Sequence, residues 1–113
     1  MEEKSIFQKI LDKEIESEII YEDDKIFSIK DINPAAKVHL LIIPKKRINT
    51  INDLQNEDKD LIGSMVLVAK ELARKYEIEE SGYRLVWNTN KDGGQTVYHI
   101  HLHLLGGEKL REF

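Results

Sequence analysis

Apolar residues recur at helical intervals in two segments of the 113-residue chain. The first segment covers residues 6–11 and predicts one short amphipathic helix. The second begins at about Asn56, where acidic residues gather, and ends at Arg74 and Lys75. Charges of these signs at the two ends complement the helix dipole. The sequence therefore predicts one short and one long helix.

Short apolar or alternating runs between turn residues predict the strands of a sheet. A turn over residues 22–24 separates the first two runs, and Asn33-Pro34 belongs to a second turn. Because the order is helix, strands, helix, strands, we expect an α+β fold with a mainly antiparallel sheet, formed as a single domain over residues 1–113. The predicted strands cover residues 18–21, 25–30, 38–43, 83–88 and 97–105.

Composition and charge narrow the functional classes. The chain is 41% hydrophobic and 34% charged, and its net charge of -4 argues against broad binding to nucleic acid. Without cysteine, neither a disulfide nor a thiolate–metal site can form. The longest apolar run, residues 38–43, is too short to cross a bilayer, and no signal peptide is evident. We therefore expect a cytoplasmic protein that binds neither membrane nor nucleic acid.

Three of the four histidines alternate along the last predicted strand, at His99, His101 and His103. In a strand, alternate side chains share one face, at a spacing of about 6–7 Å. Such a row can bind zinc or copper, can supply a nucleophile and proton donors, or can simply lie on an exposed strand. The fourth histidine, His39, lies in an apolar strand, where a buried structural role is the alternative to a functional one.

A glycine-containing loop, residues 92–96, leads into the histidine row. Glycines allow backbone N–H groups to approach an anion closely, and Gln95 and Thr96 can add hydrogen bonds. An anion site beside imidazoles suits a phosphate better than a metal ion. This combination favours phosphoryl chemistry over metal binding.

Residues 93–107 resemble the signature of the histidine triad family, in particular its branch of histidine triad nucleotide-binding proteins, the purine nucleoside phosphoramidases. Residues 19–24, 31–34 and 39–46 are similar to the N-terminal half of that family in order and spacing. The resemblance covers about residues 6–107. It implies a hydrolase that acts on a purine nucleotide, needs no cofactor and forms a homodimer partly through the long helix.

The resemblance implies catalytic roles for the four histidines. His101 resembles the nucleophile that attacks the α-phosphorus, forms a nucleotidyl-histidine intermediate and lets water release a nucleoside monophosphate. His103 resembles the residue that contacts phosphate and assists the leaving group. His99 and His39 resemble supporting imidazoles that orient the nucleophile and relay protons. An imidazole with a pKa near ~6.5 is largely neutral at pH 7 and can attack without a strong base.

The nucleotide pocket follows from the same resemblance. Asp31 resembles the acid that accepts hydrogen bonds from the ribose hydroxyls, although it could equally cap its own turn. Residues of the glycine loop and of the preceding strand would hold the phosphate and its surroundings: Gly94, Gln95, Thr96 and Asn88. The base would lie among four apolar side chains: Phe7, Ile10, Ile29 and Ile32.

Two departures from the family pattern affect these expectations. Ser5 and Gln8 occupy positions where many relatives have the cysteines of a structural zinc site, so we predict no metal. The C-terminal segment, residues 108–113, is short and lacks the tryptophan-containing tail of some relatives, which leaves the preferred leaving group open. The basic run 45–47 is expected to form a solvent-facing edge.

Three functions stay open at this point. The first is cleavage of the P–N bond of purine nucleoside phosphoramidates, and the second is hydrolysis of dinucleoside polyphosphates by the same nucleophile. His103 argues against a related transferase branch that has glutamine in its place. The third is a nucleotide-binding regulatory module whose turnover is incidental.

Overall fold

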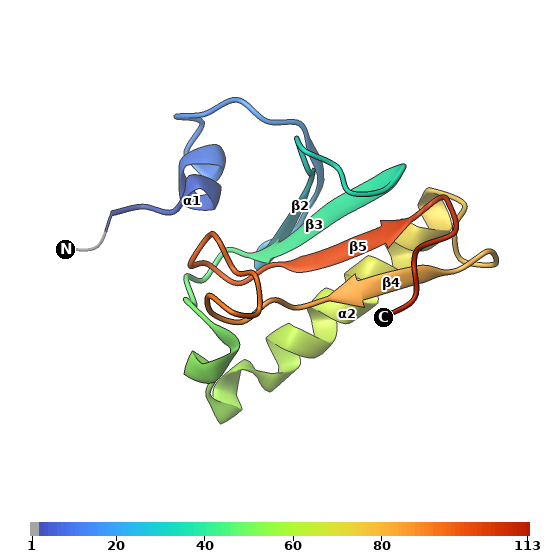
Figure 1. Ribbon diagram of the computed structural model, residues 1–113. Coiled ribbons are helices and arrows are strands. Elements are labelled where there is room, and N and C mark those ends of the chain that lie inside the picture. Colours follow the sequence, from blue (N-terminus) through green and yellow to red (C-terminus); the bar gives the residue numbers. More distant parts are fainter. Residues whose placement is uncertain (1–2) are drawn as a thin grey trace.

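The structure is a computed structural model that describes residues 3–113. Its strands form one antiparallel sheet in the order β1-β2-β3-β5-β4, with a long helix packed against it and a short helix near the N-terminus (Figure 1). The predicted α+β class is confirmed. In chain order the elements are α1 (Ile6–Leu11), β1 (Ile19–Glu22), β2 (Ile26–Lys30), β3 (Val38–Pro44), η1 (Ile51–Asp53), η2 (Asn56–Asp58), α2 (Lys59–Lys75), β4 (Tyr83–Val86) and β5 (Leu102–Gly106).

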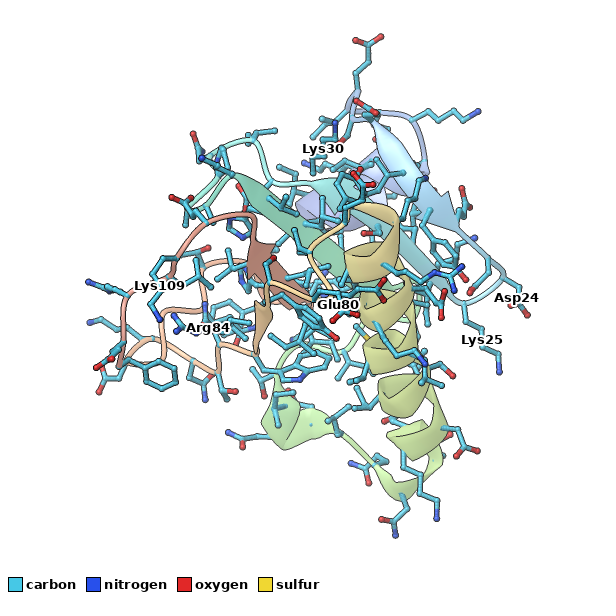
Figure 2. The ribbon with its side chains drawn as sticks, turned by 90° about the vertical axis from the view of Figure 1, so that its right-hand side faces the viewer. Asp24, Lys25, Lys30, Glu80, Arg84 and Lys109 are labelled. Carbon is cyan, nitrogen blue, oxygen red and sulfur yellow. The ribbon has the colours of Figure 1, made fainter. Side chains whose placement is uncertain are left out.

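Alternation along β3 divides the core into two parts. Leu40 and Ile42 belong to the cluster formed with α2, whereas Leu41 and Ile43 belong to the cluster that includes Phe7 of α1. This division follows from the strand geometry, which sends successive side chains to opposite faces. Figure 2 shows α2 running alongside the sheet. The sheet therefore has an α2 face and an α1 face, and the histidines described below lie on the α1 face.

The short helix α1 depends on a cap and on packing. Ser5 Oγ accepts a hydrogen bond from the Gln8 N–H at 3.1 Å, and Gln8 Oε1 accepts one from the Ser5 N–H at 2.7 Å. This capping box satisfies two of the donors that a helix leaves free at its start. A helix of six residues is marginal in isolation, so the burial of Phe7 and Ile10 against the sheet is also needed.

The long helix α2 begins at Lys59, a few residues after the predicted start at about Asn56, because a 3-10 turn occupies Asn56–Asp58. Asp60 lies in its first turn and Arg74 and Lys75 in its last, as the dipole argument requires. Charged side chains such as Asp24, Lys25 and Lys109 project away from the core (Figure 2). Within residues 3–113, no helix has the length and apolar character needed to cross a membrane.

Two predicted strands are longer than the observed ones. The last strand was expected over residues 97–105, but β5 begins only at Leu102, so His99 and His101 lie in an irregular segment before it. The preceding strand, expected over residues 83–88, ends at Val86. Val86 pairs with His103, and only Leu102 precedes His103 in β5. The chain after Trp87 therefore has no residue of β5 left to pair with. The three histidines therefore do not form a simple row on one strand.

Candidate active site

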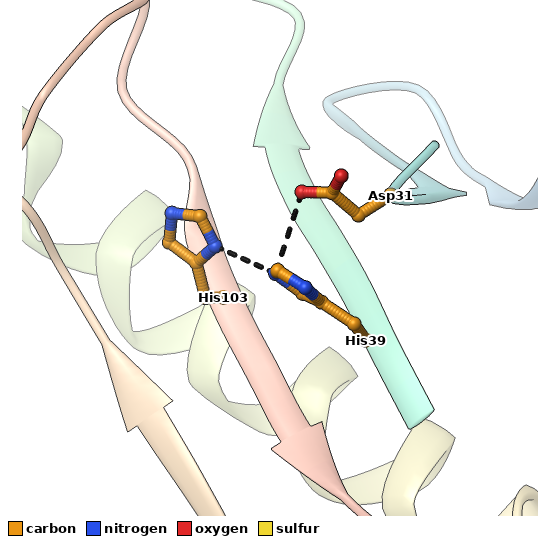
Figure 3. Close-up of side chains that lie close together, drawn as sticks. All are labelled: Asp31, His39 and His103. Atoms are coloured by element: carbon orange, nitrogen blue, oxygen red, sulfur yellow. Dashed lines mark hydrogen bonds and ion pairs between the residues drawn. The ribbon is translucent and has the colours of Figure 1, made fainter. Parts of the chain in front are cut away.

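Two of the four histidines are placed by the sheet itself. In the register of β3 with β5, His39 is opposite Leu105 and Leu41 is opposite His103. His39 and His103 are therefore diagonal neighbours on the α1 face, a relation that brings long side chains into contact. Their ring centroids are 5.2 Å apart. Asp31, which follows β2, completes this group (Figure 3).

A backbone group sets the tautomers of this pair. The Ala35 N–H donates to His39 Nδ1 at 2.9 Å, so a neutral His39 carries its proton on Nε2. His39 Nε2 lies 2.9 Å from His103 Nδ1 and 3.4 Å from an oxygen of the Asp31 carboxylate (Figure 3). Because His39 donates in this bond, His103 Nδ1 accepts. A neutral His103 therefore carries its proton on Nε2.

The Nε2–H of His103 has no partner. Among the described residues, His103 Nε2 is the one buried side-chain nitrogen or oxygen without a hydrogen bond. Leaving such a donor unpaired costs about 1–3 kcal/mol, so it marks a place where a ligand acceptor would be stabilising. A phosphoryl oxygen is an acceptor of the required kind.

The second key nitrogen belongs to His101. Its Nδ1 lies 2.9 Å from the backbone carbonyl oxygen of His99, and because a carbonyl only accepts, Nδ1 carries the proton. The lone pair is therefore on Nε2. The ring is held edge-on to Phe7, with centroids 5.0 Å apart, and beside His103, with centroids 4.9 Å apart. His101 thus presents a nucleophilic nitrogen next to an unpaired N–H donor.

His99 acts through its backbone more than through its ring. The ring is fully buried; Nε2–H donates to the Pro44 carbonyl at 2.7 Å, and Nδ1 accepts the Ser5 hydroxyl proton at 2.7 Å. Both ring nitrogens therefore bond away from His101. The group of His99 that bonds to His101 is its backbone carbonyl, whereas the bonds of its ring contain no route for a proton relay to His101.

Burial keeps all four imidazoles neutral near pH 7. It lowers the pKa of His99 and of His103 to about 4, and it also lowers the pKa of His101 and His39. The negative charge of Asp31 partly opposes the effect on His39, His101 and His103. Neutral imidazoles suit this site, because a protonated His101 would have no lone pair for attack.

The glycine loop has the backbone shape that the sequence indicates. Gly94 has a φ of 88°, and a Cβ on Gly93 would collide with the carbonyl oxygen of Thr89. Asn88 lies beside the loop, with its Nδ2 3.7 Å from where a Cβ on Gly94 would be. Thr96 is exposed. The assignment of Asn88, Gly94 and Thr96 to a phosphate site stays a prediction.

Gln95 differs from the expectation that its amide holds phosphate. Its Nε2 donates to the Asn49 carbonyl at 2.7 Å and to the Val97 carbonyl at 3.1 Å, and its Oε1 accepts from the Asn90 N–H at 2.9 Å. Both amide protons are therefore already used, and the side chain is only 5% exposed. In this conformation Gln95 closes the loop and offers no free donor to a ligand.

The residues expected around the base divide into two groups. Phe7, Ile10 and Ile29 lie together in the buried cluster on the α1 face. Ile32 lies apart from them, next to Asp31, and is 83% exposed. An apolar side chain so exposed beside a polar site has surface available for a ligand or a partner.

Sequence reasoning missed two contributors to the site. The Ala35 N–H sets the His39 tautomer, and no side-chain pattern could have indicated a backbone donor. Arg47, expected at a solvent-facing edge, instead donates to the backbone carbonyl of Tyr98 at 2.7 Å. Its place in a run of basic residues gave no signal of this contact.

One group of side chains has the composition of a metal site. Donor atoms of Asp31, His39 and His103 lie within 4.8 Å of one another, and two imidazoles with a carboxylate can bind zinc. In the structure the two imidazole nitrogens share a proton, which a metal would have to displace. The prediction of no metal stays a prediction.

Comparisons with known proteins identify the family of the chain. Residues 12–110 match the HIT domain family. The chain is 50% identical over 110 residues to a protein of Escherichia coli K12 named purine nucleoside phosphoramidase, covering 97% of this chain and 92% of that one.

Solved structures of HIT family hydrolases are similar to this chain over nearly its whole length. A HIT family hydrolase from Legionella pneumophila has a TM-score of 0.93 at 49% identity, with 96% of each chain covered. One from Clostridium thermocellum has a TM-score of 0.94 at 41% identity, covering 100% of this chain and 98% of that one. The prediction that the chain is a hydrolase is confirmed by these relatives. With a domain match over most of its length and relatives this similar, the chain belongs to the HIT family.

Proposed function

We propose that the protein hydrolyses the P–N bond of purine nucleoside 5′-phosphoramidates through a nucleotidyl-histidine intermediate. One observation carries the proposal: the free Nε2 lone pair of His101 lies next to the unpaired Nε2–H of His103. A nucleophile and an oxyanion donor, both fixed before substrate arrives, are what phosphoryl transfer requires. The name of the E. coli relative supports the choice of substrate class.

The reaction has two balanced steps. In the first, His101 Nε2 attacks the α-phosphorus, the P–N bond breaks, and the departing amine takes up one proton from solvent. In the second, water attacks phosphorus, the bond to His101 breaks, and one proton is released with the nucleoside monophosphate. In both steps His103 Nε2–H donates a hydrogen bond to the reacting group, which lowers the energy of the developing negative charge.

The remaining residues of the proposed pocket position the nucleotide. The Asp31 carboxylate accepts hydrogen bonds from the ribose hydroxyls. It also accepts one from the Asn33 N–H at 2.8 Å, which fixes its orientation. Asn88, Gly94 and Thr96 surround the phosphate, and Gln95 supports their loop. The purine lies against Ile32 and the apolar cluster of Phe7, Ile10 and Ile29.

A homodimer in the cytoplasm is part of the proposal. β4 is an edge strand that pairs with β5 alone in the described sheet order, and α2 exposes the apolar side chains of Val66 and Leu67. An unpaired strand edge and exposed apolar side chains favour association. Sedimentation of the purified chain measures this directly, and a monomer at micromolar concentration would contradict it.

The test of function is the release of AMP from adenosine 5′-phosphoramidate. It is measured for wild type and for His101→Ala in the presence of a metal chelator. We expect metal-independent release by wild type and its loss in the variant. Dinucleoside polyphosphates form a second substrate arm of the same assay. No release from either substrate by well-folded wild type would refute the enzymatic proposal and leave a nucleotide-binding module.

A further inference from the structure

The segment that carries the nucleophile lacks the support of a strand. His99 and His101 precede β5, so no ladder of sheet hydrogen bonds fixes their backbone. Yet the His101 tautomer depends on one backbone group in that segment, the His99 carbonyl, at 2.9 Å from Nδ1. Something else must hold this carbonyl in place.

The segment 47–49 supplies the missing support. The Ile100 N–H donates to the Ile48 carbonyl at 2.8 Å, and the Gln95 amide donates to the Asn49 carbonyl at 2.7 Å. The Ile100 N–H belongs to the same planar peptide group as the His99 carbonyl, so the bond to Ile48 orients that carbonyl. The peptide group on the other side of His99 is held by a side chain, that of Arg47.

Arg47 joins three parts of the chain. Its Nε donates to the Tyr98 carbonyl at 2.7 Å and to Asn49 Oδ1 at 2.9 Å. Its terminal nitrogen donates to Gln8 Oε1 at 3.0 Å and to the Glu3 carbonyl at 3.1 Å. The guanidinium therefore connects the peptide group before His99 with the N-terminal end of α1. No lysine can make these contacts together, because its single nitrogen cannot span both sides.

The second set of contacts also bears on the nucleophile. α1 contributes Phe7, whose ring is edge-on to both His99 and His101, with centroids 5.6 Å and 5.0 Å away. A residue that fixes both the start of α1 and the Tyr98 carbonyl restrains the His101 ring from its two sides. We propose that Arg47 is a positioning residue: it holds the Tyr98–His99 peptide group and α1, and through them it helps to keep the His99 carbonyl in place, so that His101 keeps its Nδ1–H tautomer and aims Nε2 at phosphorus.

The expected effect of Arg47 on kcat rests on the proposed function, whereas its effect on the His101 tautomer does not. Misplacing a reacting group by about 1 Å can lower a rate about 100-fold, and the main effect falls on kcat when substrate contacts remain. We therefore expect Arg47→Ala to lower kcat about 10- to 100-fold, with KM changed less than about threefold. Arg47→Lys is expected to restore little of the loss.

The control is a neighbouring cation in the same basic run. The Lys45 ammonium pairs with Glu22 of β1 at 2.6 Å and, among the described residues, forms no hydrogen bond or ion pair with the histidine segment. Lys45→Ala thus removes one positive charge and one ion pair and is expected to keep wild-type kcat. The comparison separates the position of Arg47 from the general effect of its charge.

A spectroscopic readout separates positioning from mere stability. Nitrogen-15 NMR of the histidine side chains reports the tautomer of His101, which is expected to be Nδ1–H in wild type and a mixture in Arg47→Ala, with thermal unfolding followed in parallel. If Arg47→Ala fails to fold, Arg47→Lys is measured by the same criteria. An unchanged tautomer with kcat within about twofold of wild type would overturn the proposal, as would a rise in KM alone. If wild type releases no AMP, the proposed function fails, and the tautomer still decides the role of Arg47.

Discussion

Acid should weaken the fold through His99, and the size of the effect follows from its burial. The pKa of the folded-state imidazole is lowered to about 4 from a reference value of 6.5, first by burial. Below pH 6.5 the unfolded chain binds a proton here that the folded chain does not bind. The free energy of unfolding therefore falls as pH drops from 6.5 towards 4 and is retained in full above 6.5. The loss from this group is about 2 kcal/mol at pH 5 and about 3 kcal/mol at pH 4.

His99→Gln isolates this contribution. A glutamine amide has a donor for the Pro44 carbonyl and an acceptor for the Ser5 hydroxyl, the two bonds that the imidazole makes, but it does not titrate. Urea unfolding, followed by the fluorescence of Trp87, is measured for both proteins at pH 7 and pH 4. The other titrating groups, His39, His101 and His103 among them, are present in both proteins, so the difference between the two pH-dependent losses reports His99.

We expect the wild type to lose about 3 kcal/mol more than His99→Gln between these pH values. A variant that is less stable at pH 7 but loses clearly less stability in acid still fits the reasoning, because only the pH-dependent part is compared. Losses that agree within about 0.5 kcal/mol would show that the imidazole is not held neutral by burial.

Three further changes test other contacts. Ser5→Ala removes both a helix cap and the donor to a buried imidazole, so it should lower the free energy of unfolding by about 2–3 kcal/mol. Thr50→Ala removes the cap of the 3-10 helix η1 and the hydroxyl bond to Asp53 but no bond to an imidazole, and it should lower the free energy of unfolding by about 1 kcal/mol in the same urea experiment. Asp31→Asn removes a negative charge that raises the pKa of His39, so NMR titration should find that pKa lower still; a rise would contradict the charge argument. Gly93→Ala forces a backbone shift in the phosphate loop and should raise KM for the phosphoramidate at least about tenfold, whereas unchanged kinetics would remove the loop from the site.

Much of the fold could be predicted because its patterns are local. The helical spacing of residues 6–11 predicts the bounds of α1, and the β-branched run before Pro44 predicts β3. The start of α2 is displaced by only a few residues, since acidic residues suit a 3-10 turn as well as a first helical turn. Period and capping chemistry are properties of neighbouring residues, which the sequence displays directly.

The site was harder to predict because its decisive bonds are not local. Alternation continues without a break from Val97 to Leu105, yet the first half of this run is irregular, because Ile100 bonds to Ile48 instead of to a strand partner. Gln95 has the right chemistry to hold phosphate but is occupied by contacts with Asn49 and Val97. Such competition between partners depends on which segments meet in space.

Hydrogen bonds to backbone groups set the tautomers of three imidazoles. The proton on His39 is set by the Ala35 N–H, and the protons on His101 and His99 by the carbonyls of His99 and Pro44. A main-chain group is present whatever side chain a residue carries. A saturation scan should therefore find position 35 permissive towards many side chains and intolerant of proline, which alone lacks the N–H. Replacing the side chain of a residue whose backbone group sets a tautomer therefore leaves that tautomer unchanged, provided that the backbone keeps its conformation.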